Sequence, residues 1–503
     1  MYRALTISSL LAATSILSCC GRPHPLAEWE PDEFAPGTPT TTWSAEWWPP
    51  AQKIDDDRAT AEAIALDPSL PPAVLRELGP LPERADLAGA IDLALMSNPD
   101  TRIAWATARA KAAEYGMARS SWYPTIAAVL DGLYSQSLLP FGGTVNIQRD
   151  RIATLSAGVE LNWTLLDFGR RQAKDDEFRN ALLASNFMFN RSLQDVVHRV
   201  QINYFQLESA QGIVDASQQD LLLSESVLAS TEERYVVGLA TMPELLVARQ
   251  SRELAGFELE AARTSQHEAR SDLLIAMGLV PGVPIAFELD ADAPLPDALS
   301  IGVERLIELA MAARPDLAAS MAEVKQAEAA VDAAEAQLNP KVDVVAGVAY
   351  NWIDYSLSPV TDLPDHGHGH DPTWSVGLLG SWVLFDGEER TNRIRAARAE
   401  QMAAMERMQL ARLNAAGEVW DAYFQWEAAN KQFAWAESLL ASSTANLEAT
   451  MASYEVGLRT MPEVLAARRA LADARQAFIT SRAQVLTTSS DLIHATGDLR
   501  IDG

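Results

Sequence analysis

The chain has 503 residues, and its formal charge is -28 because 68 acidic residues outnumber 40 basic ones. Such an acidic chain is poorly suited to binding nucleic acid, which proteins hold by neutralising phosphates with lysine and arginine. Beyond residue 20, no uninterrupted apolar run reaches the roughly 20 residues that a membrane-spanning helix needs. Composition therefore argues against a nucleic-acid-binding protein and against a bundle of membrane-spanning helices.

Residues 1–18 are typical of a lipoprotein signal peptide. Arg3 supplies a positive start, and a short apolar segment leads to the only two cysteines in the chain. The segment Ile16-Leu17-Ser18-Cys19 is similar to a bacterial lipobox, in which a small residue precedes the lipidated cysteine. We expect a covalent lipid on Cys19, with Cys20 as the alternative, and no other cofactor. A signal peptide without lipidation is the other interpretation. Residues 19–84, with many prolines, are expected to form an extended arm.

The two halves of the chain repeat each other. The segment Leu93–Asp100 corresponds to Leu309–Asp316 at an offset of 216 residues, whereas Trp163 corresponds to Trp382 at an offset of 219, which then persists. The register must therefore slip between Pro124 and Trp163, where a loop can absorb three residues. The expected boundaries are 85–280 for the first repeat, 281–301 for a linker and 302–499 for the second repeat.

Each repeat is expected to contain a helix, two strands and two further helices, in that order. Asn98 is a plausible N-cap with Pro99 at the first helical position, and Pro124 should end this helix. Proline-free stretches that end at Gly238 and Gly457 each predict a helix of roughly 100 Å, followed by another helix. Alternating β-branched and aromatic residues predict strands at about 125–138, 151–168, 341–357 and 373–385.

Four strands in one chain cannot close a barrel, and an open sheet edge is not tolerated in hydrocarbon. Three chains together would supply twelve strands, an even number within the range that transmembrane barrels use. A soluble four-stranded sheet is the alternative structure.

Two segments with the same detailed pattern, Tyr235–Leu246 and Tyr454–Leu465, predict helical hairpins. In each, a glycine ends the incoming helix in a left-handed cap, and a proline stands in the first turn of the outgoing helix. Each also has the threonine and glutamate spacing of a capping box. These capping pairs are Thr241 with Glu244 and Thr460 with Glu463.

The duplicated element order, the two Tyr-x-Val-Gly-Leu hairpins, the Asp167-Phe168-Gly169 sequence and the lipobox together resemble the TolC-like family of outer-membrane efflux proteins. The resemblance covers about residues 85–499. It implies a mainly α fold with a membrane β-barrel: a homotrimer with a twelve-stranded barrel in the outer membrane and a long α-helical barrel across the periplasm. It also implies that the helical tips dock on a periplasmic adaptor protein served by an inner-membrane pump.

The same resemblance implies two sets of site residues. In the family, an arginine and a tyrosine of the second hairpin hold an acidic residue of the first and close the inner end of the duct. The matching gate residues are Arg459, Tyr454 and Glu244, and Glu463 would add a ring of carboxylates that favours cations. Ala466 stands where some relatives have a second acidic ring, and helix caps or solvated coiled-coil charges are the alternative interpretation. The adaptor-docking residues would be Val237, Gly238, Leu239, Thr241, Val456, Gly457, Leu458 and Thr460.

Three histidines could bind a metal ion such as zinc or copper. His366, His368 and His370 alternate with glycines, and we expect them in a polar loop between the second pair of strands, so no structured metal site is predicted. Trp163 and Trp382 are expected to be interfacial anchors or packing residues.

The sequence contains no nucleophile elbow, phosphate-binding glycine loop or zinc-helix motif, so an enzyme is not expected. The favoured function is a passive outer-membrane channel of a tripartite efflux pump that exports small molecules, either drugs or metal ions. A duct for type I protein secretion and a lipid-anchored periplasmic coiled-coil scaffold without a pore are the alternatives.

Overall fold

The computed structural model describes residues 82–141, 146–290, 294–296, 301–357 and 366–497. The expected signal peptide, Cys19, Cys20 and nearly all of the N-terminal arm lie outside the described residues. Within the described part of the chain, no helix combines the length and the apolar character needed to cross a membrane.

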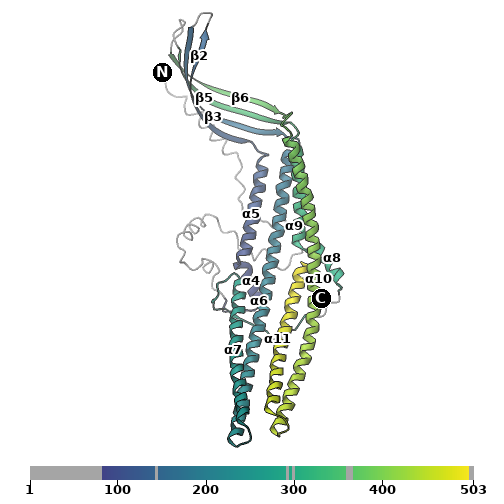
Figure 1. The fold of residues 1–503 in the computed structure, drawn as a ribbon. Helices are drawn as coiled ribbons and strands as arrows, with labels where there is room; N and C mark the ends of the chain where they lie inside the picture. The colour runs from purple at the N-terminus through teal and green to yellow at the C-terminus, as the bar shows by residue number, and fades with distance from the viewer. Residues whose placement is uncertain (1–81, 142–145, 291–293, 297–300, 358–365, 498–503) are drawn as a thin grey trace. The chain divides into compact units, whose positions relative to one another are not determined.

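The two repeats contain the same elements, as Figure 1 shows along the chain. The first consists of α4 (Leu87–Ser97), α5 (Pro99–Ser120), β2 (Thr125–Phe141), β3 (Asn146–Leu166), α6 (Arg170–Val236) and α7 (Met242–Ala276). The second consists of α8 (Val303–Ala313), α9 (Pro315–Ala336), β5 (Lys341–Leu357), β6 (His366–Ser381), α10 (Glu389–Glu455) and α11 (Met461–Thr496). The predicted order is therefore present in both repeats, but a short helix, α4 or α8, precedes it in each.

Two short strands missed by the sequence analysis join the ends of the first repeat. β1 (Arg84–Ala85) pairs in parallel with β4 (Ala286–Phe287), which lies in the segment expected to be only a linker. Two-residue strands carry no periodicity, so sequence alone had no signal for them.

The described residues form two compact units. One unit contains the β-sheet together with the helical segments within Ala110–Ala184 and Ser320–Arg407. The other contains the remaining helical segments, including the whole of α7 and α11 and the ends of α6 and α10 that join them.

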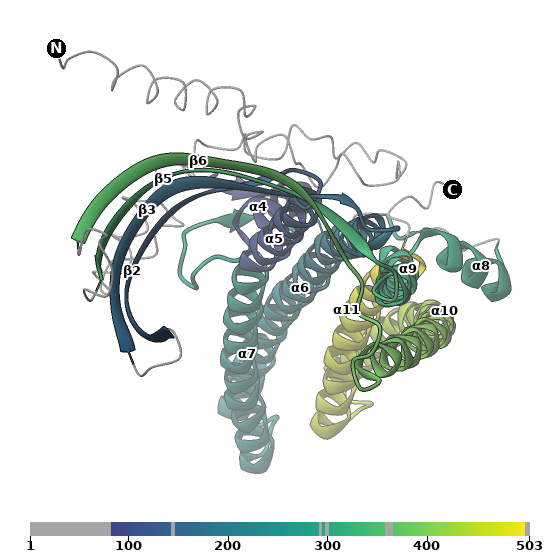
Figure 2. The ribbon, with the colours of Figure 1, turned by 90° about the horizontal axis from the view of Figure 1, so that it is seen from above.

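The sheet has the strand order β2-β3-β5-β6, and every neighbouring pair is antiparallel. In Figure 2 these strands form one strongly curved sheet. Thr125 pairs with Asn162, and Lys341, its counterpart at an offset of 216, pairs with Ser381, which lies 219 residues after Asn162. Because the strands pair in equivalent register, the slip of three residues falls in the connection between the paired strands, as the repeat analysis predicted.

The second strand of each pair differs from its predicted bounds. β3 covers Asn146–Leu166 rather than 151–168, and β6 covers His366–Ser381 rather than 373–385. The prediction that His366, His368 and His370 lie in a loop is therefore wrong, because they pair with Ser356, Asp354 and Trp352 of β5. Alternating glycines give little strand propensity, so the extension of β6 reflects its partner strand rather than its own residues.

The helical unit has an apolar core where the ends of α7 and α11 meet the middle of the long helices. Around α7, the core cluster includes Leu93, Val196 and Leu273; around α11, it includes Leu306, Val419 and Leu492. Both clusters are assembled from residues far apart in the sequence but related by the duplication. The repeat therefore determines where each pair of long helices is anchored.

Candidate functional site at the hairpin ends and the sheet

Both helical hairpins turn at a glycine in the left-handed region. Gly238 has φ 78° and Gly457 has φ 77°, values that a side chain would make unfavourable. Leu239 N donates to Arg234 O at 2.8 Å, and Leu458 N donates to Ser453 O at 2.8 Å, so each chain reversal is closed in the same way. The predicted left-handed glycine caps are confirmed.

Each outgoing helix begins with a capping box. Thr241 N donates to Glu244 Oε2 at 2.7 Å, and Thr460 N donates to Glu463 Oε2 at 2.7 Å. The threonine hydroxyls donate to the same carboxylate oxygens at 3.0 and 2.9 Å. The capping interpretation is confirmed, so both glutamates already have a structural role before any role in a gate.

The turns expose apolar side chains. Val237 and Leu239 are 68% and 70% exposed, and Val456 and Leu458 are 71% and 79% exposed. Each turn thus exposes two aliphatic side chains two residues apart, which is the kind of surface suited to contact with another molecule. The hairpins nevertheless differ in packing. The first methionine of the outgoing helix is 49% exposed in the first hairpin (Met242) and 1% exposed in the second (Met461).

The arginine expected to hold the first hairpin is paired within its own hairpin. Arg459 Nη1 lies 2.6 Å from Glu463 Oε1, four residues along the chain. The hydrogen bond from Thr460 N, followed by the pairing with Arg459, lowers the pKa of Glu463 to about 2. The expected pairing of Arg459 with Glu244 is thus not the one that the structure shows in a single chain. The i,i+4 partner is simply nearer, and Glu244 is occupied as a cap.

Tyr454 does lie between the hairpins, but its partner is a residue that the sequence analysis missed. The guanidinium carbon of Arg234 lies 4.7 Å from the centre of the Tyr454 ring, a cation–π contact from α6 to α10. Burial raises the pKa of Tyr454; the charge of Arg234 partly opposes this shift, and the charge of Glu244 adds to it. The arginine at the end of α6 could have been noticed because its counterpart 219 residues later is Ser453.

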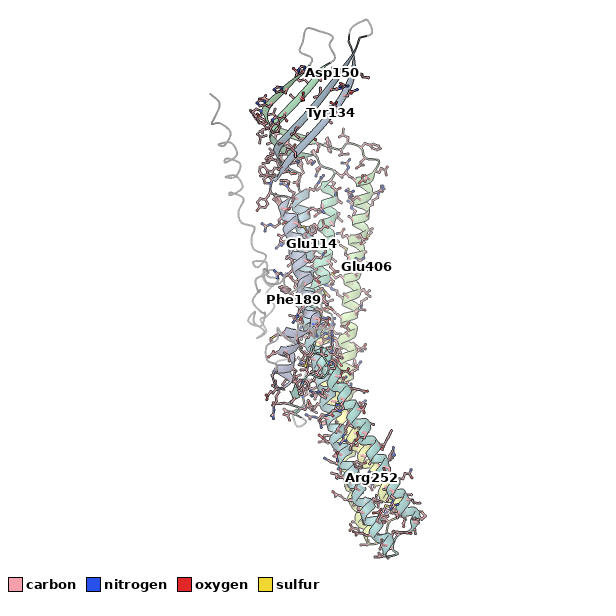
Figure 3. The ribbon with its side chains drawn as sticks, turned by 90° about the vertical axis from the view of Figure 1, so that its left-hand side faces the viewer. Glu114, Tyr134, Asp150, Phe189, Arg252 and Glu406 are labelled. Atoms are coloured by element: carbon pink, nitrogen blue, oxygen red, sulfur yellow. The ribbon has the colours of Figure 1, made fainter. Side chains whose placement is uncertain are left out.

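One face of the sheet is mainly apolar and the other is mainly polar. Directly opposed residues share a face, and successive residues alternate between faces. The apolar face carries Ile126, Leu130, Tyr134, Leu155, Val159, Trp163, Val344, Val348, Trp352, Trp374, Val376 and Leu378. Several of these side chains are largely exposed in one chain; Leu130 is 75% and Trp374 79% exposed. Figure 3 shows Tyr134 among the side chains of the sheet.

The other face is predominantly polar and acidic, although it includes apolar residues such as Leu133 and Ile353. Lys341 is 2.8 Å from Asp343 on this face and so does not offset the other carboxylates. The polar and charged members are Asp131, Ser135, Asp150, Ser156, Glu160, Asp343, Asn351, Asp371, Thr373 and Ser375.

The two tryptophans that align between the repeats make equivalent hydrogen bonds. Trp163 Nε1 donates to Trp122 O, and Trp382 Nε1 donates to Leu338 O, both at 3.0 Å. Each therefore ties the end of the second strand of its pair to the residues just before the first strand.

The three histidines lie on the mainly apolar face of the sheet, at the start of β6, where their side chains are exposed. Across the described ranges, no group of three or more His, Cys, Asp or Glu side chains could hold a metal ion. The His370 ring instead lies 5.9 Å from the Tyr350 ring, which packs edge-on against Trp352 at 4.6 Å.

Known proteins share this architecture. Protein CyaE of Bordetella pertussis is 29% identical, with the alignment covering 87% of this chain and 91% of CyaE. The pyoverdine export outer membrane protein OpmQ of Pseudomonas aeruginosa is 26% identical, with 82% and 85% covered. The solved structure of the outer-membrane channel OprN superimposes with a TM-score of 0.70 at 19% identity, over 86% of this chain and 93% of OprN.

The model of one protein family matches both repeats. The match covers residues 90–279 and 306–498, and so includes both hairpins and all four strands of the sheet. The chain belongs to the outer membrane efflux protein family.

Proposed function

We propose that the protein is the outer-membrane channel of a tripartite efflux system, and that three chains form a passive duct for small solutes. The observation that carries this proposal is the sheet with one exposed apolar face and one acidic face. An apolar face of this size suits lipid, and the acidic face suits a water-filled passage.

The open edges of the sheet support the trimer. Among the described residues, β2 and β6 each pair with only one neighbouring strand, so one edge of each strand has backbone donors and acceptors without a sheet partner there. Hydrocarbon cannot satisfy those groups, whereas β6 of one chain and β2 of the next can satisfy each other. Three chains then close a barrel of about twelve strands, an even number within the known range.

The hairpin ends form the periplasmic end of the duct in this proposal. The exposed Val237, Leu239, Val456 and Leu458 are the surface on which the adaptor docks, and the inner-membrane pump behind the adaptor supplies the energy. Arg459, Glu463 and Tyr454 belong to the second hairpin and form the inner constriction with Glu244. Within one chain, Arg459 is paired with Glu463. A closing contact between Arg459 and Glu244 therefore requires either a neighbouring chain or a shift of Arg459.

Small solutes are the proposed cargo, and the carboxylates on the polar face and at Glu463 would favour cations among them. Pyoverdine export by the relative OpmQ supports a small-molecule cargo. A lipid on Cys19 would hold the mature protein to the outer membrane without spanning it.

Two measurements test the proposal on the detergent-solubilised full chain. Light scattering, with detergent subtracted, should give three times the mass of the chain, and the same sample should insert conducting pores into planar bilayers. A stable monomer that does not conduct would overturn the proposal in favour of a periplasmic scaffold. A conducting trimer whose deletion abolishes protein secretion but leaves tolerance to toxic small molecules intact would replace small solutes with proteins as cargo.

A further inference from the structure

The two hairpins of one chain meet along an apolar seam. Near the hairpin ends, Val227 of α6 packs with Met461 and Val464 of α11. Further along, Leu447 of α10 packs with Ala467 and Leu471 of α11, and the partly buried Leu223 of α6 lies against them. Aliphatic contacts are attractive but not directional, so this seam by itself would tolerate sliding of one hairpin along the other.

One buried ion pair interrupts the seam. Arg468 of α11 and Asp220 of α6 are 6% and 7% exposed, and Arg468 Nη1 lies 2.6 Å from Asp220 Oδ2. Arg468 Nη1 also lies 3.3 Å from Asp220 O, and Nη2 donates to Ser251 Oγ of α7 at 2.7 Å. A single guanidinium therefore joins the second hairpin to both helices of the first.

The ion pair serves to define the alignment of the two helices more than to add stability. Burial raises the pKa of Asp220, and the nearby Arg468 partly reverses the shift, so the carboxylate is costly to bury without its partner. Buried ion pairs often add little stability compared with apolar residues of similar volume, and their best-attested role is to specify register. Beside these apolar contacts, a directional contact fixes one axial alignment.

The positions in the other repeat that are equivalent to Arg468 and Asp220 do not form a buried ion pair. The counterpart of Arg468 is Arg249 (468 - 219), an exposed arginine 3.0 Å from Glu232 on the surface of its own hairpin. The counterpart of Asp220 is Leu439 (220 + 219). Ion pairs within the first hairpin, such as that of Arg252 with Glu225 at 3.3 Å, are likewise superficial (Figure 3).

We propose that the Asp220–Arg468 ion pair is the positioning contact that sets the axial register of the second hairpin against the first, and that closure of the gate depends on this register. The proposal rests on the proposed channel function. Arg468 lies two helical turns from the start of α11, so a slip of α11 there is transmitted directly to Thr460, Glu463 and the turn that carries Arg459. A slip of one turn, about 5.4 Å, would remove Arg234 from the Tyr454 ring.

The test separates register from stability by comparing single and paired substitutions. Asp220→Asn leaves Arg468 buried without a charged partner and should lower the thermal midpoint of the trimer. The double variant Asp220→Leu, Arg468→Leu replaces the pair with apolar side chains. It should recover the thermal midpoint of the wild-type trimer, but its channel should still close less completely than that of wild type. Arg249→Leu, the repeat counterpart, is the matched control and should match wild type in both measurements.

Closure is read in planar bilayers. The double variant should spend about tenfold more time open than wild type, which corresponds to about 1.4 kcal/mol. A double variant that recovers stability and also closes like wild type would overturn the proposal, because the ion pair would then contribute only cohesion. Failure of the wild-type protein to conduct at all would instead overturn the channel function.

A second readout does not require conduction. Spin labels at Val236→Cys and Glu455→Cys, in a Cys20→Ser background diluted with unlabelled chains, report the distance between the two hairpins of one chain. The double variant should broaden or shift this distance distribution, and Arg249→Leu should not. An unchanged distribution in the double variant would contradict the assignment of register to this pair.

Discussion

His198 of α6 and His494 of α11 stack ring on ring, with centroids 4.2 Å apart and ring planes 8° from parallel. Each ring has its own carboxylate: His198 Nε2 lies 3.3 Å from Asp491 Oδ1, and His494 Nε2 lies 2.7 Å from Asp195 Oδ1. Arg191 also contacts Asp195, at 3.1 Å. Two imidazoles in this arrangement are tolerated best when at least one is neutral.

We therefore expect mild acid to destabilise the helical unit. Burial lowers the pKa of His494 below 6.5, an effect that the hydrogen bond to Asp195 only partly opposes. The folded state thus favours the neutral ring. The contribution of His494 to the stability of the folded state is therefore complete above the unfolded pKa and is lost as pH falls below about 6.5. Asp195 contributes in a lower range, since its pKa is lowered from 3.8 despite burial. Thermal midpoints at pH 7.5 and 5.5 measure the difference.

Substitution identifies the source of that acid sensitivity. His494→Gln should show a smaller drop between the two pH values than wild type, whereas His267→Gln, at an exposed position of α7, should keep the full drop. An equal drop in all three proteins would show that other groups are responsible.

Alanine at the ends of α7 and α11 should be strongly destabilising. Gly278 and Gly497 have φ 77° and 73°, and a Cβ on Gly278 would lie 2.6 Å from Asn98 Cα. Gly278→Ala should therefore lower the unfolding free energy by more than about 1 kcal/mol, measured by thermal or denaturant unfolding. Gly256→Ala is the control, because this helical position has open space around it. This variant should gain about 0.5–1 kcal/mol in unfolding free energy.

Ionic selectivity should depend on the second hairpin more than on the first. Glu463→Gln should reduce the preference for cations, measured as the reversal potential across a salt gradient, and Glu253→Gln on α7 should leave it unchanged. Because the pKa of Glu463 is about 2, its charge persists to low pH, so wild-type selectivity at pH 4 should still include its contribution. Equal selectivity of wild type and Glu463→Gln would remove Glu463 from the constriction.

The two faces of the sheet should tolerate charge differently. Val376 and Ser375 are neighbours on β6 but lie on opposite faces. Val376→Arg should cost about 2–4 kcal/mol in lipid and reduce outer-membrane assembly, whereas Ser375→Arg should assemble and alter conductance. Membrane fractionation and the yield of trimer measure the assembly of the two variants. Better assembly of Val376→Arg than of Ser375→Arg would mean that the two faces have been assigned the wrong way round.

Local patterns were sufficient for much of the fold. The capping pair Thr241 and Glu244 is three residues apart, and the turn at Gly238 needs only its own backbone freedom, so both could be predicted from neighbouring residues. The first strand of each pair was also placed at its observed start, because an alternating pattern follows a helix-ending proline. β6 was placed late, since the glycines beside His366 and His368 conceal a strand that is determined by its pairing with β5.

The sequence by itself determined the duplication, the long helices and the capped hairpins, because each depends on periodicity or on contacts between residues a few positions apart. Arg459 also pairs locally, with Glu463 four residues away on its own hairpin. Only the tertiary structure decided which side chains meet across the helices. Asp220 meets Arg468, and His198 meets His494, across hundreds of residues. Such pairings depend on how two helices are aligned along their length, which no pattern within either helix specifies.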